Sequence, residues 1–471
     1  MSFFQTIKNI LWTIKELRHR IAVALFQTIK NIWKIKELRE RIAVTLLLVL
    51  VYRLGCYIVL PGISPSDLDA LANFTNRSGL MQLLDMFSGG AFSQASIFAL
   101  GIMPYITASI VIQLLGMVLP SFQKMQRDGE SGRQRLNQYT RYLTVLILCL
   151  QGPAYLVNLK VQVASAGGSV EMGLMTIIPL TIILAAGSMF IMWLGERITD
   201  RGVGNGISFI ILVGIIARLP QALRFEFVSR LPGAEGSQGG LVMFLAELIL
   251  LFAVTVGAVL LVQGTRKVPV QYAKRIVGNK QYGGARQYIP LKVNAAGVMP
   301  IIFAQAIMFI PITLAGFGTS EGSTGFMSAF SDMNGFWYNF VYFIMIVAFT
   351  YFYTAITVRP TQMAEDMKRN NGFIPGVKPG KKTAEYLDVI MSRITLPGSI
   401  FLGVVAILPA FARAFGVSQN FAQFFGGTSL LILVGVVLDT LQQIETHLMM
   451  HHYDGLMKDG QIKGRTTGSM Y

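Results

Sequence analysis

The sequence predicts an all-α membrane protein with ten transmembrane helices. Three observations carry that prediction: the composition, the length of the apolar runs and the distribution of basic residues. Of the 471 residues, 53% are hydrophobic and only 14% are charged. So few charged side chains would not cover the surface of an ordinary soluble fold. Most of the chain is therefore expected to lie in lipid.

Ten apolar runs are each about 20 residues long, the length that an α-helix needs to cross the hydrocarbon core of a bilayer. They lie at 41–60, 96–119, 138–159, 174–195, 205–219, 240–263, 295–316, 336–358, 387–411 and 422–446. Leu219 and Pro220 are expected to end the fifth run early, because proline removes a helical hydrogen bond. That run could instead continue through Ala222 to Val228.

Lysine and arginine gather in alternate connections, as the positive-inside rule requires of a membrane protein. The net charge of +16 therefore lies between apolar runs and not in one basic, nucleic-acid-binding domain. The segments before the first run, after the second, after the sixth and after the eighth are basic. Both termini are expected in the cytoplasm, with long cytoplasmic loops at 264–292 and 359–386.

The expected division has an amino-terminal segment, two inverted five-helix halves of the kind found in transport proteins, and a cytoplasmic tail. These parts cover 1–40, 41–230, 231–447 and 448–471. In the amino-terminal segment, the basic amphipathic stretch Phe4–Leu25 recurs as Phe26–Leu46 with one residue dropped. The repeat is either a helix held at anionic headgroups or a duplication without a role of its own.

No catalytic, cofactor or metal site is predicted. His447 and His451 are four residues apart, but no third ligand lies near them. The glycines within 202–206 follow no strand, so they indicate a tight turn between helices and not a phosphate loop. Cys56 and Cys149 both lie in apolar stretches, and no disulfide is expected.

Glu247 is the carboxylate that the sixth run places in the membrane, where an ionised group is costly. It could couple ion movement to solute movement, which would make the chain a secondary transporter of a small solute. It could equally face a neighbouring helix or a partner subunit. Both interpretations stay open on the residues alone.

Several strings resemble the SecY family, in that family's order, from about residue 35 to the end. They include SIFALGIMPYITASIVIQ at Ser96–Gln113, DGESGRQRLNQYTR at Asp128–Arg141, MWLGERITDRGVGNGIS at Met192–Ser208 and NGFIPGVKPG at Asn371–Gly380. The resemblance implies a non-enzymatic channel of the bacterial inner membrane. Unfolded polypeptides would cross through its central pore, and hydrophobic segments would leave sideways into lipid.

The resemblance also implies a pore ring and a plug. The family's ring positions fall on Ile102, Ile106, Ile207, Ile211, Ile302 and Ile432. Branched aliphatic side chains could seal around a passing chain without hydrogen-bonding to it. The segment 62–94 resembles the plug, a short helix ended by glycines, with Leu80, Leu83, Leu84, Met86, Phe87, Gly89 and Gly90.

A lateral gate is implied between the second and third spans and the seventh and eighth, with Thr107, Ser109, Gln113 and Pro300. The two basic loops resemble a docking surface for the ribosome and the ATPase SecA. Its expected residues are Arg266, Lys267, Lys274, Arg275, Lys280, Pro375, Gly376, Lys378 and Pro379. Family members usually have arginine at position 378, so lysine there keeps the charge but loses the planar fork.

The remaining implied partners are the small subunits SecE and SecG, unfolded preproteins or nascent chains, and membrane lipids. The sequence contains no Walker motif, so ATP hydrolysis is expected of SecA.

Overall fold

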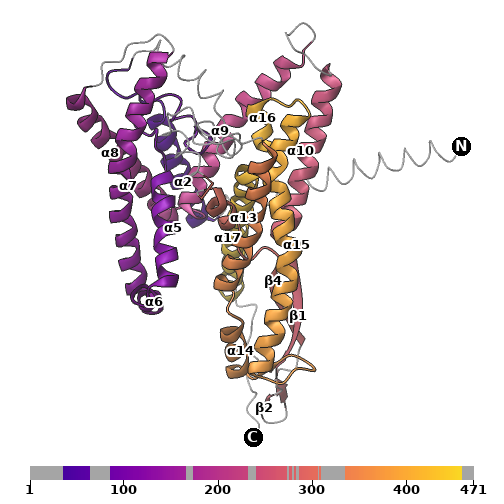
Figure 1. Ribbon diagram of the computed structural model, residues 1–471. Coiled ribbons are helices and arrows are strands. Elements are labelled where there is room, and N and C mark those ends of the chain that lie inside the picture. The colour runs from indigo at the N-terminus through magenta and orange to yellow at the C-terminus, as the bar shows by residue number, and fades with distance from the viewer. Residues whose placement is uncertain are drawn as a thin grey trace, which may run out of the picture. The chain divides into compact units, whose positions relative to one another are not determined.

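The computed structural model describes residues 35–63, 85–165, 173–231, 240–272, 275–277, 280–282, 286–305, 307–308 and 335–458. Long helices dominate this part of the chain (Figure 1). Most of the duplicated amino-terminal segment, residues 64–84 of the predicted plug and the end of the seventh apolar run lie outside the described residues.

The helices overlap the apolar runs, but not all of the expected limits are right. The run expected from residue 96 is helical only from Met103, because 97–102 form turns, and the helix expected over 41–60 ends at Gly55. The helices are α2 (Lys36–Gly55), α5 (Met103–Val118), α6 (Pro120–Arg127), α7 (Gly129–Ser165), α8 (Leu174–Arg201), α9 (Gly206–Ser229), α10 (Gly240–Gln263), α13 (Phe336–Thr357), α14 (Pro360–Arg369), α15 (Lys381–Ala414), α16 (Gln419–Ala422) and α17 (Gly427–Lys458). Among the described residues, seven helices are long and apolar enough to cross a membrane, or eight if the bent pair α5 and α6 is one span. The chain is therefore a helical protein with several membrane spans.

The helix of the fifth apolar run, α9, corrects one expectation. α9 continues past Pro220 to Ser229, so the predicted end at residue 219 is wrong and the longer alternative is right. Prolines also lie inside α7, α8 and α15. A proline leaves one helical carbonyl without its donor, and neighbouring helices and side chains in a membrane bundle can satisfy that group.

The chain forms two compact units. One comprises Met1–Leu54, Met192–Ile210 and Val437–Tyr471, and the other comprises Gly55–Ile191 and Ile211–Val436. In the first unit, the Thr45 hydroxyl accepts a bond from the Val203 N–H at 3.1 Å, and the Gln443 carbonyl accepts one from Gly204 at 3.0 Å. The glycines within 202–206 thus form the predicted turn, between α8 and α9.

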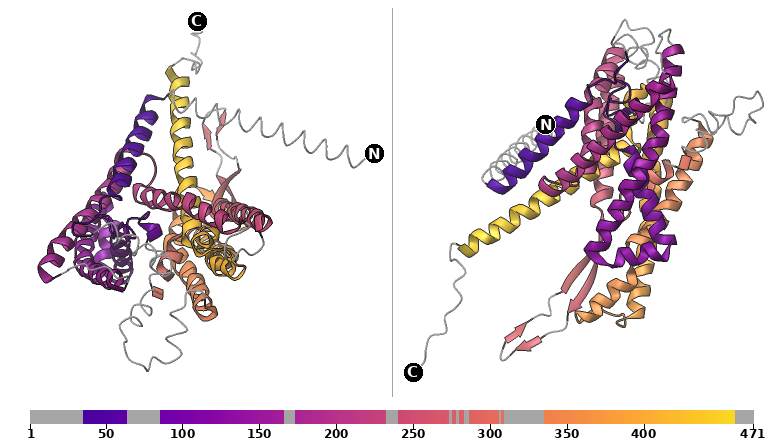
Figure 2. Two further views of the ribbon diagram at one scale, coloured as in Figure 1. Left: turned by 90° about the horizontal axis from the view of Figure 1, so that it is seen from above. Right: turned by 90° about the vertical axis from the view of Figure 1, so that its left-hand side faces the viewer.

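The second unit contains strands that the prediction of helices throughout did not include. β1 (Thr265–Tyr272) pairs antiparallel with β4 (Arg286–Lys292) on one side and with β5 (Gly372–Phe373) on the other. A separate hairpin joins β2 (Arg275–Val277) to β3 (Lys280–Tyr282), and Figure 2 shows it at the end of the longer ladder. The two predicted cytoplasmic loops therefore share one sheet.

An apolar cluster fixes this sheet to the helices that follow it. Alternate residues of β1, Val268 and Val270, are buried, as the period of two in a strand requires. They pack with side chains from β4, α14, β5 and α15, and the cluster comprises Val268, Val270, Leu291, Met367, Ile374, Leu387, Ile390, Met391 and Ile394.

Candidate functional site

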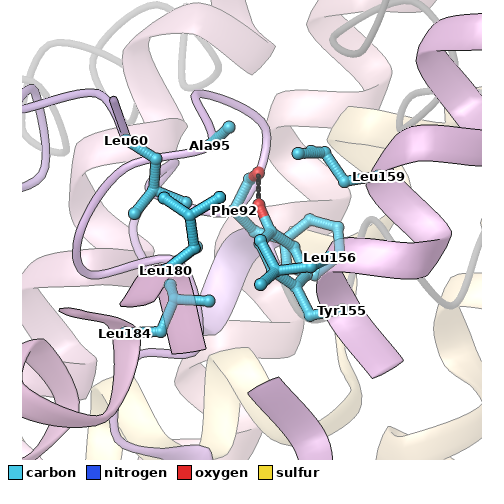
Figure 3. Packing of buried hydrophobic residues seen from close by; sticks show 9 residues of the cluster. Leu60, Phe92, Ala95, Tyr155, Leu156, Leu159, Leu180 and Leu184 are labelled. Carbon is cyan, nitrogen blue, oxygen red and sulfur yellow. Dashed lines mark hydrogen bonds between the residues drawn. The ribbon is translucent and has the colours of Figure 1, made fainter. Parts of the chain in front are cut away.

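The segment that joins the predicted plug to α5 folds as a series of buried turns. Phe92 lies at its centre and packs edge-on against Tyr155 of α7, with ring centroids 5.0 Å apart. The Tyr155 hydroxyl donates to the Phe92 carbonyl at 3.2 Å (Figure 3). The surrounding apolar cluster comprises Leu60, Phe92, Ala95, Ala99, Tyr155, Leu156, Leu159, Leu180 and Leu184. Packing on α7 and α8 thus fixes the chain on the way into α5.

A glycine of α8 permits the closest backbone approach in this region. A Cβ atom at Gly187 would lie 2.3 Å from the Ile97 carbonyl oxygen, so any larger side chain would displace the segment. Five residues further on, Ile102 is buried directly before the first turn of α5. The position of this predicted ring residue therefore depends on small side chains in a neighbouring helix.

The predicted ring residues come from several helices. Ile102 and Ile106 lie at the start of α5, Ile211 lies in α9, and Ile432 lies in α17. Ile302 lies in a short described helical stretch, and Ile207 belongs to the other compact unit. Ile102, Ile211 and Ile432 are buried, whereas Ile106, Ile207 and Ile302 are half-buried. Their convergence on one ring stays a prediction.

Of the predicted plug segment 62–94, only residues 62–63 and 85–94 fall within the described residues. Leu80, Leu83 and Leu84 lie outside them. Residues 85–87 are helical, and Met86 and Phe87 are buried. The chain then turns at Gly89 and Gly90, which both have positive φ angles and so need glycine.

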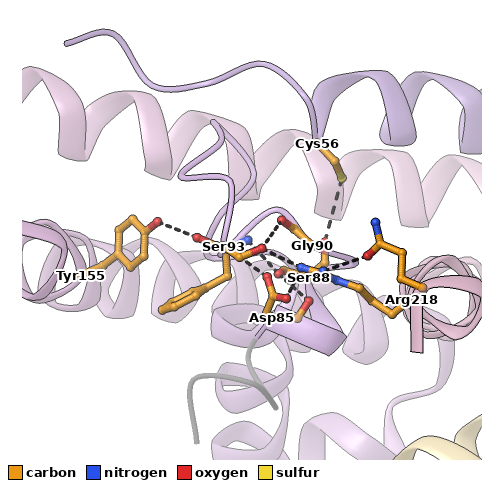
Figure 4. Close-up of polar contacts among 9 residues, drawn as sticks. Cys56, Asp85, Ser88, Gly90, Ser93, Tyr155 and Arg218 are labelled. Atoms are coloured by element: carbon orange, nitrogen blue, oxygen red, sulfur yellow. Dashed lines mark hydrogen bonds and ion pairs between the residues drawn. The ribbon is translucent and has the colours of Figure 1, made fainter. Parts of the chain in front are cut away.

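A polar network surrounds Asp85 at this turn (Figure 4). One carboxylate oxygen accepts a bond from the Ser93 N–H at 2.8 Å, and the other pairs with Arg218 of α9. Arg218 also donates to the Ser93 hydroxyl at 2.6 Å. Burial raises the pKa of Asp85, and the charge of Arg218 is the main effect that opposes this rise. Asp85 therefore depends on Arg218 for its negative charge.

The predicted gate residues receive different environments. The Gln113 carbonyl accepts a bond from the Tyr353 hydroxyl of α13 at 3.2 Å, and the Gln113 amide lies 3.4 Å from the Ser109 hydroxyl. Thr107 instead donates to the carbonyl of Met103 in its own helix, and Pro300 is buried. The structure therefore joins Gln113 of α5 to α13, and the gate itself stays a prediction.

Aromatic packing joins Phe303 of the predicted seventh span to α13, which also carries Tyr353. Phe303 lies 6.0 Å from Tyr353 and 5.8 Å from Phe349, measured between ring centroids. Tyr353 was not among the predicted gate residues. Its helix was expected in the gate, but an aromatic residue in a membrane helix gives no sign of which side chain it will contact.

Glu247 is paired within the chain. Its carboxylate accepts a bond from Arg230 at 2.7 Å, and Arg230 also bonds to Glu226 at 3.1 Å. Arg230 further donates to the Gly416 carbonyl at 2.7 Å, and the Ser418 N–H donates to Glu226 at 3.1 Å. Of the two interpretations of Glu247, the neighbouring helix is the one that the geometry favours. In the described part of the chain, no three His, Cys, Asp or Glu side chains gather to hold a metal ion.

The described docking residues lie at the surface. Arg266 and Lys267 of β1 are exposed, as are Pro375, Gly376, Lys378 and Pro379 after β5. The Lys378 carbonyl accepts a bond from the Thr383 hydroxyl at 2.9 Å, which anchors this tip to the start of α15. Lys274 lies outside the described residues, and Arg275 and Lys280 belong to β2 and β3. Docking itself stays a prediction.

Comparison with known proteins identifies the family. The SecY family model matches residues 96–441, which is most of the chain. The chain belongs to the SecY family. Protein translocase subunit SecY of Streptomyces coelicolor is 42% identical over 425 residues, which cover 87% of this chain and 95% of that protein. Protein translocase subunit SecY of Mycobacterium bovis is 40% identical over 439 residues, with the same coverage.

Solved structures of related channels have the same fold as this chain. The structure described as that of a protein conducting channel matches with a TM-score of 0.60 at 18% identity and covers 87% of this chain and 92% of that one. Sec61 in the canine ribosome-channel complex matches with a TM-score of 0.56 at 17% identity and the same coverage. At these identities the likeness supports the fold, and the sequence relatives support membership of the SecY family.

Proposed function

We propose that this chain is the central channel subunit of a preprotein translocase, which passes unfolded polypeptides across the membrane. The observation that carries the proposal is the identity of 42% with a protein translocase subunit over 87% of the chain. Nothing in the comparisons supports the alternative of a small-solute transporter, and the pairing of Glu247 with Arg230 provides a structural role for the carboxylate that suggested it.

The pore ring is proposed to seal around the travelling chain. Branched aliphatic side chains exclude water, and they offer no hydrogen bond that would retain a passing polypeptide. The burial of the ring candidates supports this role. None of the six is exposed, whereas α10 exposes Leu245, Ile249 and Phe252 on its outer surface.

The lateral gate is proposed to open between α5 and α13. The Gln113–Tyr353 bond joins α5 to α13, and the ring of Phe303 packs on Phe349 and Tyr353 of α13. Each is a weak interaction, so a sufficiently apolar segment could replace them by partitioning into lipid. Sorting by transfer free energy requires no chemical step.

The channel is proposed to lie in the bacterial inner membrane with both termini in the cytoplasm. SecE and SecG would complete it, and SecA or a ribosome would supply the polypeptide. The shared sheet supports a docking role, because it gives both basic loops a common base below an exposed tip. Among the similar structures, Sec61 is described in a ribosome-channel complex.

Deletion of residues 80–90 tests the channel. The full chain, with and without this segment, would be incorporated into planar bilayers, and the ionic current would be recorded. A channel that has lost its plug should conduct ions continuously, whereas a small-solute transporter should not. Removal of 461–471 serves as a deletion of equal length elsewhere in the chain. Equal currents from both deletions would contradict the proposal.

A further inference from the structure

Arg218 joins the two ends of one turn. It pairs with Asp85 at the start of the turn and donates to the Ser93 hydroxyl at its end, at 2.6 Å. The Ser93 N–H also donates to Asp85 at 2.8 Å, so the turn is closed on itself at the same point. A single side chain of α9 therefore holds both ends of the segment that includes Met86 and Phe87.

The helix surface next to Arg218 is shaped for the same segment. A Cβ atom at Gly214 would lie 3.1 Å from the Phe87 carbonyl oxygen and 3.2 Å from the Gly89 nitrogen, so the backbone lies directly against α9. Gly214 is one helical turn before Arg218 and on the same face. Ile211 precedes Gly214 by three residues on that face. One face of α9 thus carries the ring candidate Ile211, then Gly214, which lies against the backbone of the turn, and then Arg218.

The ion pair is only partly buried. The Asp85 side chain is 9% exposed and that of Arg218 is 26% exposed. A fully buried pair is very costly to separate, because both charges lose their partner in a dry medium. A guanidinium that is already partly exposed loses less when the pair parts, so this contact is reversible at moderate cost.

We propose that the Asp85–Arg218 pair is a latch that holds the plug against α9 until a polypeptide enters the channel. The proposal rests on the proposed channel function. Entry of a chain displaces Ile211 and the α9 face that carries it, which separates Arg218 from Asp85 and Ser93. The turn between Asp85 and Ser93 is then released as one piece. Arg218 is a positioning residue in this scheme and does not contact the transported chain.

A native cysteine reports on the latch. Cys56 is buried, and its sulfur lies 3.9 Å from the Ser88 carbonyl, beneath the same turn. Its alkylation by a polyethylene-glycol maleimide therefore requires the turn to move. Cys149 is exposed and would be replaced by serine, so that only Cys56 is labelled in the full chain in native membranes.

Removal of either charge should open the turn. In Asp85→Asn and in Arg218→Gln we expect Cys56 to be labelled about tenfold faster, as for loss of a partly buried ion pair. The double variant should be labelled no faster than the quicker single variant, because both changes remove one contact. Arg224→Gln is the matched control, since Arg224 is an exposed arginine of the same helix.

Bilayer currents separate the latch from the channel. If the 80–90 deletion conducts ions but both single variants match Arg224→Gln in current and labelling, the latch is wrong and the channel proposal stands. If the deletion does not conduct, both proposals fail. Asp85→Asn preserves the shape of the side chain, so it carries the test should Arg218→Gln accumulate poorly.

Discussion

Two arginines, Arg218 within α9 and Arg230 directly after it, hold buried carboxylates in different surroundings. Arg230 is 5% exposed, and its partners Glu226 and Glu247 are 1% and 3% exposed. Arg218 is 26% exposed, and its partner Asp85 is 9% exposed. Both networks join an arginine to carboxylates, but only the Asp85–Arg218 pair is partly exposed.

The two networks also connect different kinds of element. Arg230 joins the end of α9 to α10 and to the Gly416 carbonyl after α15, all of which are parts of long helices or their ends. Arg218 joins α9 to a short turned segment. A fully buried network between long helices favours a permanent joint, whereas a partly exposed pair on a short segment favours a reversible contact. The comparison teaches that solvent access, and not the presence of opposite charges, distinguishes the two.

The largest effect is expected from Arg230→Met. The substitution leaves two carboxylates in a dry site without their cation, and breaking such a network costs about 3–5 kcal/mol. Thermal unfolding of the purified full chain should therefore occur at a markedly lower temperature, while Arg224→Met on the exposed face of α9 should leave it unchanged. If Arg230→Met instead kept its stability and increased the bilayer current, the Arg230 network would be a contact that opens during transport. It would then not be a permanent joint.

A smaller effect is expected from Glu247→Gln. The amide carbonyl can still accept a bond from Arg230, and Glu226 remains as its anion, so a loss of about 1 kcal/mol is expected. Translocation of a preprotein into vesicles should continue at the rate of the parent chain. Normal unfolding together with lost transport would give Glu247 a functional role and would revive the coupling interpretation.

The sequence alone predicted the helices well, and physical reasons explain where it failed. Apolar runs of membrane length located α10 and α13 to within a residue at each end, because lipid imposes both composition and length. Pro220 was expected to end α9, since the cost of an interior proline depends on neighbouring groups that the sequence does not reveal. The strand β1 was missed inside a loop, although Val268 and Val270 are two residues apart, because Pro269 between them argues against a strand.

The candidate site was predictable in position and not in its contacts. The resemblance to the family predicts that Gln113 lies in the gate, and the structure supplies Tyr353 as its partner, 240 residues further along the chain. Asp85 and Arg218 are 133 residues apart. Periodicity reports which face of an element is buried, but pairing across such separations is set by the packing of the whole bundle. The latch and the α9–α10 joint therefore became visible only in three dimensions.

The smallest effect is expected at the hydrogen bond between Gln113 and Tyr353. Unlike the two arginine networks, this contact is uncharged. Gln113→Leu removes one hydrogen bond, worth about 1 kcal/mol, from the proposed closed gate. Test segments in a model membrane protein should then be integrated at a slightly lower hydrophobicity, because less transfer free energy is needed to part α5 from α13. The hydrophobicity at half-integration measures this shift.

Tyr353→Phe is the matched variant, because it removes the same bond from the other side and keeps the aromatic ring that packs on Phe303. It should produce the same shift, and the double variant should add nothing further if both act through this bond. Opposite shifts in the two single variants would show that the glutamine and the tyrosine act separately. The unfolding temperature should stay near that of the parent chain in all three, since a neutral, partly hydrated bond contributes far less to stability than the dry arginine joint.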